Sequence, residues 1–221
     1  MIRAVGFDLD DTLAVTEVDR ELLLDRATEA AGVSEELDRE AYLDAHRRHS
    51  GAEGRRPIFE ALVGSEDAEA LANTYREGIE DALQPAEGAE AVVAELRERY
   101  RVGLLTDGPE RTQLGKLERL DWEDDFDAVV VTGGINAPKP DPVAFGRLLD
   151  ALGVAAEETA YVGDHPERDI AGAAAAGLWP VQVLYDGGPE AHPDAAATVS
   201  RSALRSLPGL LEALGDGTDD T

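Results

Sequence analysis

The chain has no cysteine, only two lysines and no long apolar run. The absence of cysteine excludes disulfides, thiolate metal sites and cysteine nucleophiles. The longest uncharged stretch, residues 170–185, is interrupted by two glycines and a proline. It falls short of the roughly 20 apolar residues that a membrane helix needs, so no membrane partner is expected. The first residues lead straight into a strand pattern, so no signal peptide is visible and a cytoplasmic location is expected.

Positive charge is also scarce. The chain has 20 Lys and Arg residues against 47 Asp and Glu residues, a net charge of −27. A phosphate backbone would be repelled, so no nucleic-acid partner is expected. The acidic residues are spread along the whole length, and the two lysines are Lys116 and Lys139. This pattern indicates a halophilic protein adapted to very salty cytoplasm, where salt screens self-repulsion; the alternative is an ordinary acidic protein.

Short apolar runs alternate with helical patterns over most of the chain. Strands are predicted at residues 2–7, 102–105, 128–131, 160–162, 181–184 and 197–199, and helices at 87–100, 110–120, 141–152 and 169–176. The alternation predicts an α/β fold, a Rossmann-like parallel sheet core with helices on both faces. The helix at 110–120 should bury Leu114, Leu117 and Leu120.

One segment breaks this alternation, because residues 16–84 show helical patterns only. They predict an inserted all-helical domain within an α/β core formed by residues 1–15 and 85–214. Hinges are expected at 14–16 and 84–85, and a disordered polar tail at 215–221. The first two inserted helices should bury the stripes Leu22, Leu23, Ala27 and Ala30, and Leu37, Ala41 and Leu43.

Polar side chains follow four of the predicted strands. In chain order these are Asp8, Asp10 and Asp11, then Thr106 and Asp107, then Lys139, then Asp164 and Asp169. Ligands of an open parallel sheet bind at the carboxyl ends of its strands. We therefore expect the four loops to meet at one site.

The acidic residues of this site predict a metal ion. Buried like charges are costly unless a cation compensates them. Asp8, Asp10 and Asp164 supply hard oxygen ligands, and with no cysteine and few histidines Mg²⁺ is the expected cofactor.

The remaining residues of the site suit a phosphate group. Thr106 offers a hydroxyl beside free backbone N–H groups, where Gly108 and Pro109 open a helix. Lys139 lies between prolines, and its compact charge can offset a phosphoryl group. Asp107 is also assigned to this phosphate-binding group. It either faces the substrate or shapes the turn at Thr106.

At these residues the sequence resembles the haloacid dehalogenase-like hydrolase superfamily. The four motifs of that family occur in order: Asp8-Leu9-Asp10-Asp11-Thr12, then Thr106, then Lys139-Pro140-Asp141-Pro142, then Gly163-Asp164 with Asp169. The resemblance extends to about residue 185, and the helical insertion matches the position of the family's helical cap. Four motifs in order are much more specific than any one of them.

The resemblance implies a role for each catalytic residue. Asp8 would attack the substrate phosphorus and become an aspartyl-phosphate. Asp10 would protonate the leaving oxygen and then take a proton from water. Thr106 and Lys139 would hold the phosphoryl oxygens.

It also implies how the ion would be held. Mg²⁺ would bind Asp8, the backbone carbonyl of Asp10, and Asp164, while Asp169 would orient water or a ligand of the ion. The implied function is hydrolysis of a small phosphorylated metabolite.

The sequence also bears on three other functions. A dehalogenase is disfavoured because a departing halide needs no acid at Asp10. A phosphomutase or other phosphotransferase of the same superfamily shares the motifs and stays open. A non-enzymatic receiver domain would carry its phospho-acceptor after the third strand of a compact domain of about 120 residues, which the helical insertion disfavours. The sequence leaves the oligomeric state open.

A group of basic residues in the insertion has two interpretations. Arg47, Arg48, His49, Arg55 and Arg56 either contact an anionic part of the substrate or pair with neighbouring carboxylates. The second interpretation is favoured, since surface arginines commonly pair in this way.

Overall fold

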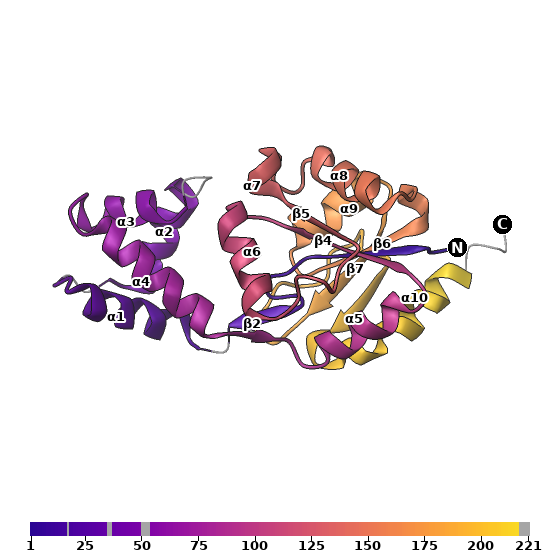
Figure 1. Ribbon diagram of the computed structural model, residues 1–221, viewed down its shortest axis with the longest axis horizontal. Helices are drawn as coiled ribbons and strands as arrows, with labels where there is room; N and C mark the ends of the chain where they lie inside the picture. Colours follow the sequence, from indigo (N-terminus) through magenta and orange to yellow (C-terminus); the bar gives the residue numbers. More distant parts are fainter. Residues whose placement is uncertain (17, 35–36, 50–53, 217–221) are drawn as a thin grey trace. The chain divides into compact units, whose positions relative to one another are not determined.

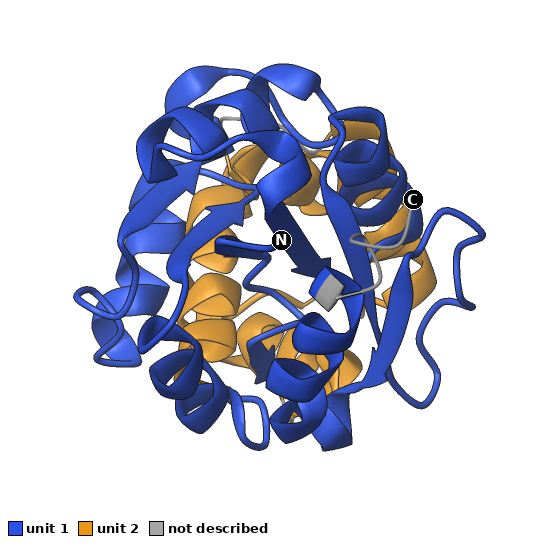
Figure 2. Ribbon diagram, turned by 90° about the vertical axis from the view of Figure 1, so that its right-hand side faces the viewer, with its two compact units in different colours: residues 1–15, 85–221 blue, residues 16–84 orange. Residues whose placement is uncertain are grey.

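The computed structural model of the chain describes residues 1–16, 18–34, 37–49 and 54–216 (Figure 1). The chain divides into two compact units (Figure 2). Unit 1 comprises Met1–Val15 and Pro85–Thr221, and unit 2 is Thr16–Gln84. Among the described residues, no helix has both the length and the apolar character needed to cross a membrane.

A six-stranded sheet lies at the centre of the described part of unit 1, with the order β5-β4-β1-β6-β7-β8. Each neighbouring pair is parallel. The strands are β1 (Ala4–Phe7), β4 (Arg101–Thr106), β5 (Ala128–Val131), β6 (Thr159–Gly163), β7 (Trp179–Leu184) and β8 (Ala197–Ser200). The predicted α/β fold with a parallel sheet is therefore confirmed.

Helices cover both faces of this sheet, with α8 and α9 on one face and α5 and α10 on the other (Figure 1). The helices of unit 1 are α5 (Ala89–Arg97), α6 (Glu110–Arg119), α7 (Thr132–Ile135), α8 (Pro142–Leu152), α9 (Gly172–Ala175) and α10 (Leu207–Asp216). Shorter helical turns are η1 (Ala156–Glu158), η2 (Pro166–Ala171) and η3 (Arg201–Ser206). Because both faces are covered, all four residues of β1 are buried and read as a continuous apolar run.

Helix α8 shows how sequence pattern and packing agree in this unit. Its carboxylate cap, Asp141, accepts a hydrogen bond from the Val143 backbone N–H at 2.9 Å. The apolar face places Phe145 edge-on to the Tyr161 ring, with 5.2 Å between ring centroids. On β4, a Cβ atom at Gly103 would lie 2.8 Å from a methyl carbon of Leu148, so glycine permits this close approach.

Three sequence-based details of unit 1 are wrong. Helix α6 buries Gln113, Lys116 and Leu117, while Leu114 is exposed. The predicted helix at 169–176 starts earlier, in the π-helical turn η2, and ends in α9. Helix α10 continues through residue 216, so the predicted disordered tail does not begin at 215; residues 217–221 lie outside the described residues.

Unit 2 contains the helices α1 (Arg20–Ala31), α2 (Arg39–His49), α3 (Arg56–Val63) and α4 (Ala68–Asp81). Three aromatic rings lie in its core, and the centroid of Tyr42 is 5.5 Å from that of Phe59 and 5.2 Å from that of Tyr75. Such tilted ring pairs stabilise a core beyond the area that they bury.

The predicted buried stripes of unit 2 are partly wrong. In α1, Leu24 is buried and Leu22 is 43% exposed. In α2, the buried residues are Tyr42 and Ala45, whereas Leu43 faces solvent. Where leucines are adjacent in the sequence, more than one of them fits a helical spacing. The pattern therefore could not show which of them faces the core.

The segments expected to be hinges contain short strands that the sequence did not predict. Residues 14–16 and 83–85 form the short strands β2 (Ala14–Thr16) and β3 (Leu83–Pro85), which pair as a separate two-stranded sheet. Three residues each give little periodicity, so neither strand was predicted.

The basic residues of unit 2 contact its own side chains. Arg47 lies 3.4 Å from an oxygen of Asp44, and Arg48 pairs with the same carboxylate. Arg55 instead donates to the Tyr42 hydroxyl at 2.6 Å and packs on the Tyr75 ring. The contacts of Arg47 and Arg48 agree with the interpretation that these residues pair with neighbouring carboxylates, whereas Arg55 pairs with tyrosines instead.

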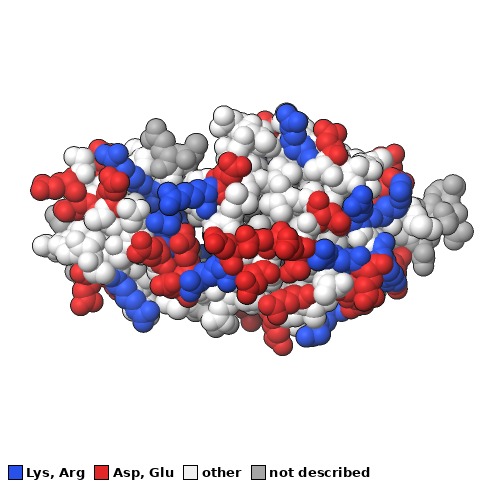
Figure 3. Space-filling view, viewed as in Figure 1, with Lys and Arg blue, Asp and Glu red and all other residues white. Residues whose placement is uncertain are grey.

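Among the charged side chains on the face shown in Figure 3, Asp and Glu cover more of the surface than Lys and Arg. Arginines are interspersed among them, and the described ion pairs of arginine are largely exposed, as for Arg3 with Glu158 and Arg97 with Asp125. Exposed pairs of this kind contribute little stability. Ion pairs do not change the net charge of −27, so repulsion among the remaining carboxylates is left for dissolved salt to screen.

We expect the melting temperature to rise steeply with KCl from dilute to molar concentrations. The screening length falls from about 10 Å at 0.1 M salt to about 3 Å at 1 M, which weakens repulsion among surface carboxylates. Differential scanning calorimetry across a KCl series would measure the rise. Sucrose at matched osmolality is the control, since it stabilises without screening charge. A melting temperature that stays flat or falls would contradict the halophilic interpretation.

Candidate active site

The polar residues predicted for the site lie together at the carboxyl ends of the central strands. One pocket is lined by Asp8, Asp10, Asp11, Thr106, Asp107, Lys139, Asp164, Arg168 and Asp169. The structure therefore brings together every residue that the sequence assigned to the site, and adds Arg168. β1, β4 and β6 are neighbours in the sheet, which is why loops distant in sequence meet here.

Lys139 is the centre of this arrangement. Its buried Nζ atom lies 2.6 Å from Oδ1 of Asp8 and 2.7 Å from Oδ1 of Asp169. It also donates to the Tyr161 hydroxyl at 3.1 Å and to the Leu105 carbonyl at 3.3 Å. A buried ammonium held by two carboxylates and two neutral acceptors is fixed in position.

The charge of Lys139 is maintained by these neighbours. Burial lowers the pKa of Lys139, but the carboxylates of Asp169 and Asp8 outweigh it and raise the pKa well above its usual value. Tyr161 has its pKa raised by burial and thus keeps its proton, which it donates to the Leu105 carbonyl at 3.0 Å. The site therefore holds a permanent cation at its base.

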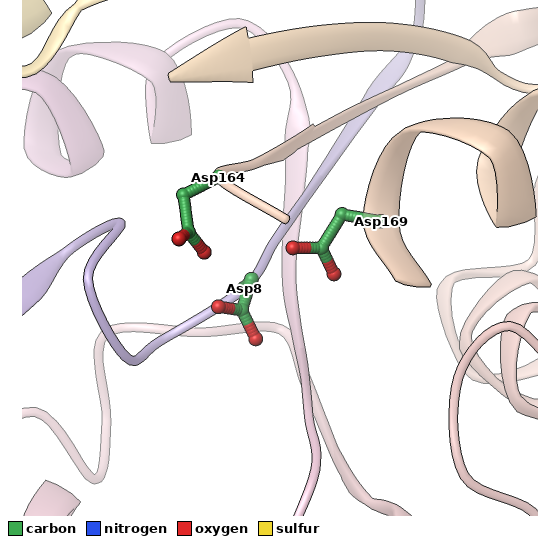
Figure 4. A group of neighbouring side chains, drawn as sticks. All are labelled: Asp8, Asp164 and Asp169. Carbon is green, nitrogen blue, oxygen red and sulfur yellow. The ribbon is translucent and has the colours of Figure 1, made fainter. Parts of the chain in front are cut away.

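Three carboxylates lie close enough to share a cation. One oxygen from each of Asp8, Asp164 and Asp169 falls within 4.8 Å of the others (Figure 4). Burial raises the pKa of Asp8 well above its usual value. Lys139 lowers this pKa, whereas the carboxylates of Asp169 and Asp10 raise it further. Burial, with Asp169 and Asp11, raises the pKa of Asp164 to about 6. Burial is the largest cause of both shifts, and the neighbouring carboxylates add to it. A hard divalent cation such as Mg²⁺ would favour the ionised form of each carboxylate.

The three carboxylates are not equivalent. Both oxygens of Asp169 accept hydrogen bonds, one from Lys139 and one from the His165 backbone N–H at 2.9 Å. The π-helical turn η2 brings Asp169 so near β6 that a Cβ atom at Gly163 would lie 2.5 Å from it. Asp164 accepts from the Tyr185 hydroxyl at 3.3 Å. Asp169 is thus suited to orient its neighbours, and Asp8 and Asp164 are suited to bind an ion.

Asp107 and Thr106 fix the loops that surround the pocket. The Asp107 carboxylate accepts from the Thr132 hydroxyl at 2.9 Å and from the Lys139 backbone N–H at 3.0 Å. It therefore joins the loop after β4 to the loop that carries Lys139. Thr106, the buried last residue of β4, has its hydroxyl 2.6 Å from Nε2 of Gln113. Pro109 precedes α6 in an extended conformation, one position earlier than the expected first-turn proline.

The loop after β1 reverses direction tightly. Asp11 has a φ of 63°, a left-handed conformation that aspartate tolerates better than most residues. Its N–H donates to the Ala14 carbonyl at 2.8 Å, while the buried Leu9 and Leu13 anchor the loop. Asp8 and Asp10 are thereby held on this turn, and Asp11 is the residue at which the chain reverses.

Several residues of the site were not predicted. Tyr161 lies within a predicted strand, Tyr185 directly follows another, and Arg168 carries no motif of its own. Gln113 and Lys116 on α6 contact the carboxylate of Asp10, although the sequence placed the buried face of this helix elsewhere. The scarcity of lysine was the available signal for Lys116, because a chain that avoids lysine on its surface retains it where the side chain has a specific contact.

Comparisons with known proteins agree with this geometry. A family model for the haloacid dehalogenase-like hydrolases matches residues 2–177. A ribulose-1,5-bisphosphate 5-phosphatase of Halopiger xanaduensis is 31% identical over 99% of this chain and 99% of its own length. The crystal structure of a HAD phosphatase from Thermococcus onnurineus superimposes with a TM-score of 0.73 and 26% identity, covering 95% of this chain and 98% of that one.

Other relatives match over part of their length. The phosphoserine phosphatase of Thermus thermophilus is 39% identical over 63% of this chain and 57% of its own length. An N-acylneuraminate-9-phosphatase of Rattus norvegicus is 36% identical over 58% of this chain and 52% of its own length. The chain thus spans little more than half the length of these two relatives.

Proposed function

The chain belongs to the haloacid dehalogenase-like hydrolase family, and on this basis we propose that it is a Mg²⁺-dependent phosphatase acting on a small phosphomonoester through an aspartyl-phosphate. The observation that carries the proposal is the position of Asp8, a buried carboxylate between a fixed ammonium and two further carboxylates at a pocket. Relatives named as phosphatases of small phosphorylated compounds support the same chemistry.

In the first half of the proposed reaction, a carboxylate oxygen of Asp8 attacks the substrate phosphorus. A bond forms between that oxygen and phosphorus, and the bond from phosphorus to the ester oxygen breaks. Asp10 gives its proton to the departing oxygen, which leaves as an alcohol. Lys139 and the Thr106 hydroxyl offset and orient the charge of the phosphoryl oxygens.

In the second half, water attacks the phosphorus of the aspartyl-phosphate. Asp10, now ionised, takes a proton from this water as its oxygen bonds to phosphorus. The bond between phosphorus and the Asp8 oxygen breaks, which releases inorganic phosphate and restores the Asp8 carboxylate. Asp10 regains the proton that it gave in the first half, so the cycle is balanced.

Mg²⁺ would be held by Asp8, Asp164 and the backbone carbonyl of Asp10, with Asp169 orienting its surroundings. When bound, the ion supplies charge neutralisation that lets an anionic carboxylate approach an anionic phosphate. The close approach of three carboxylate oxygens and the raised pKa values of Asp8 and Asp164 support this assignment.

Unit 2 is proposed to be the helical cap that selects the substrate. Its residues form a helical core of their own and interrupt the α/β unit at a single place in the chain, between residues 15 and 85. This arrangement supports an inserted module that varies independently of the chemical site.

We expect the protein to release inorganic phosphate from an aryl phosphate in the presence of Mg²⁺ and to lose that activity in EDTA. Removing the ion would leave the carboxylates of the pocket uncompensated, so catalysis should fall by at least about a hundredfold. A colorimetric assay for free phosphate, run on the aryl ester and a panel of phosphorylated metabolites, would measure hydrolysis and not transfer to a second sugar.

The control is restoration of activity when excess Mg²⁺ is added back to the chelated protein. Undiminished phosphate release in thoroughly metal-free buffer would contradict the proposed site.

A further inference from the structure

Helix α6 buries two polar side chains that the proposed reaction does not use. Gln113 is 2% exposed and Lys116 is 7% exposed. They are three residues apart, so they lie on the same face of the helix. Burying an amide and an ammonium is unfavourable unless each has a partner. The Lys116 ammonium and the Gln113 amide nitrogen find that partner in Asp10, in the loop after β1, whereas the buried Oε1 atom of Gln113 has no hydrogen-bond partner among the described residues.

The contacts hold the Asp10 carboxylate from one side. Nζ of Lys116 is 2.6 Å from both Oδ1 and Oδ2, and Nε2 of Gln113 is 3.0 Å from Oδ2. The Asp10 side chain is nevertheless 40% exposed and lines the pocket, whereas that of Lys116 is 9% exposed. The ammonium is therefore buried, whereas the Asp10 side chain reaches the pocket.

The Gln113 amide is itself fixed. Its Nε2 atom lies 2.6 Å from the Thr106 hydroxyl oxygen and 2.5 Å from the Asp107 carbonyl oxygen. These partners are the last residue of β4 and the first residue of the loop that follows it, so the orientation of Gln113 depends on the same strand end that lines the pocket. Asp10 is thereby tied to the strand beside its own and not only to its own loop.

We propose that Lys116 and Gln113 are positioning residues for Asp10. They keep the Asp10 carboxylate in a fixed position relative to Asp8. Asp10 can then give its proton to the leaving oxygen while Asp8 attacks the phosphorus. This inference rests on the proposed function. A misplacement of about 1 Å in a reacting group can lower the rate by about a hundredfold, so a carboxylate with two rotatable bonds benefits from such restraint.

The choice of lysine supports this role. Arginine supplies nearly all other cations of the chain, and a general need for positive charge on α6 would be met by arginine. The compact ammonium has three donors and can lie close to both oxygens of one carboxylate within a buried space. The planar guanidinium is larger and would displace the carboxylate towards the pocket.

The test compares Lys116→Met and Gln113→Leu with Arg111→Met, which removes an exposed cation from the same helix. For an alkyl phosphate, whose leaving oxygen needs a proton, kcat should fall by about 10- to 100-fold in the first two variants with KM nearly unchanged. For an activated aryl phosphate, the rate of aspartyl-phosphate formation, measured as the pre-steady-state burst, should fall by less than about threefold, because that leaving group needs little proton donation. The later hydrolysis step uses Asp10 as a base for both substrates, so the substrates are compared on the burst and not on kcat alone. Arg111→Met should match the wild type on both substrates.

A double-mutant cycle separates positioning from a general structural effect. In an Asp10→Asn background, adding Lys116→Met should cause little further loss of kcat, since both changes act on one group. Independent, multiplying losses would overturn the inference. Equal losses in the rate of aspartyl-phosphate formation from the alkyl and aryl substrates in Lys116→Met would also overturn it.

A crystal structure of Lys116→Met gives a readout that needs no turnover. The Asp10 carboxylate should leave its wild-type position or adopt several conformers. An unchanged, well-ordered Asp10 would overturn the inference even in an active enzyme. Absence of phosphate release by the wild type, with a displaced Asp10 in the variant, would instead contradict the proposed function and leave the positioning role standing.

Discussion

Replacing Asp8 by Asn should lower kcat for phosphate release by about 10⁴-fold or more, the scale found when a covalent nucleophile is removed. The substitution is nearly isosteric, and the amide oxygen can still accept the hydrogen bond that Lys139 donates at 2.6 Å. The anionic oxygen that attacks phosphorus is lost. Acid-quenched reactions should therefore contain phosphorylated wild-type protein and no phosphorylated variant, as measured by intact-protein mass spectrometry.

Asp11→Asn is the matched control for this variant. Asp11 lies in the same loop and lines the same pocket, but its backbone is left-handed, a conformation that asparagine tolerates well. Its activity should stay within a few-fold of the wild type. Phosphoenzyme formed by Asp8→Asn, with deamidation to Asp excluded by its mass, would contradict the nucleophilic role of Asp8.

Replacing Lys139 by Met should damage both catalysis and stability. Loss of a fixed cation at the phosphoryl position should lower kcat by about 10³-fold. The change also leaves Asp8 and Asp169 as buried carboxylates without their ammonium partner, which lies 2.6 Å and 2.7 Å from them. Breaking a buried ion pair in this way destabilises a protein by about 3 kcal/mol or more, which for this chain length lowers the melting temperature by about 6–12 °C.

The stability loss should depend on Mg²⁺. In EDTA the uncompensated carboxylates determine the melting temperature, whereas a bound cation should restore part of the loss. Lys116→Met serves as the comparison, because its partner Asp10 is 40% exposed and can be hydrated, so its melting temperature should fall less. An unchanged melting temperature for Lys139→Met in metal-free buffer would show that the buried ion pairs do not stabilise the fold.

The fold was predictable because its strands are buried on both faces. Apolar runs such as residues 102–105 and 128–131 stand out against acidic helices, and their observed strands, β4 and β5, differ by at most one residue at each end. The polar residues at the strand ends followed from the same reasoning, because a parallel sheet gathers the ends of its strands. The polar residues of the pocket were therefore predictable from the order in which strands and acidic residues follow one another in the sequence.

The face of α6 could not be predicted by the same means. Hydrophobic periodicity assumes that a buried helix face is apolar, and Leu114 and Leu117 satisfied that assumption. The structure turns Gln113 and Lys116 inward because their partner is the charged carboxylate of Asp10. Contacts between polar groups distant in sequence have no periodic signature.

The turn that carries Asp169 was missed for a different reason. An Ala- and Gly-rich segment with helical propensity predicts an ordinary helix over 169–176. The structure forms a π-helical turn from Pro166 to Ala171, which directs Asp169 towards Lys139 and the His165 N–H. Local propensity does not distinguish this wider turn from an α-helix, whereas the contacts of Asp169 do.

Both lysines of the chain are buried in the active site, each with its ammonium against a carboxylate. Acylating reagents such as succinimidyl esters need a deprotonated amine that solvent can reach, and neither lysine offers one while the protein is folded. Acylation of Lys116 or Lys139 therefore reports unfolding, since a modified lysine marks a molecule whose active site has unfolded. For the same reason, lysine-directed dyes, crosslinkers and resins will not attach to the folded protein through these side chains, and arginine or carboxylate chemistry is needed instead.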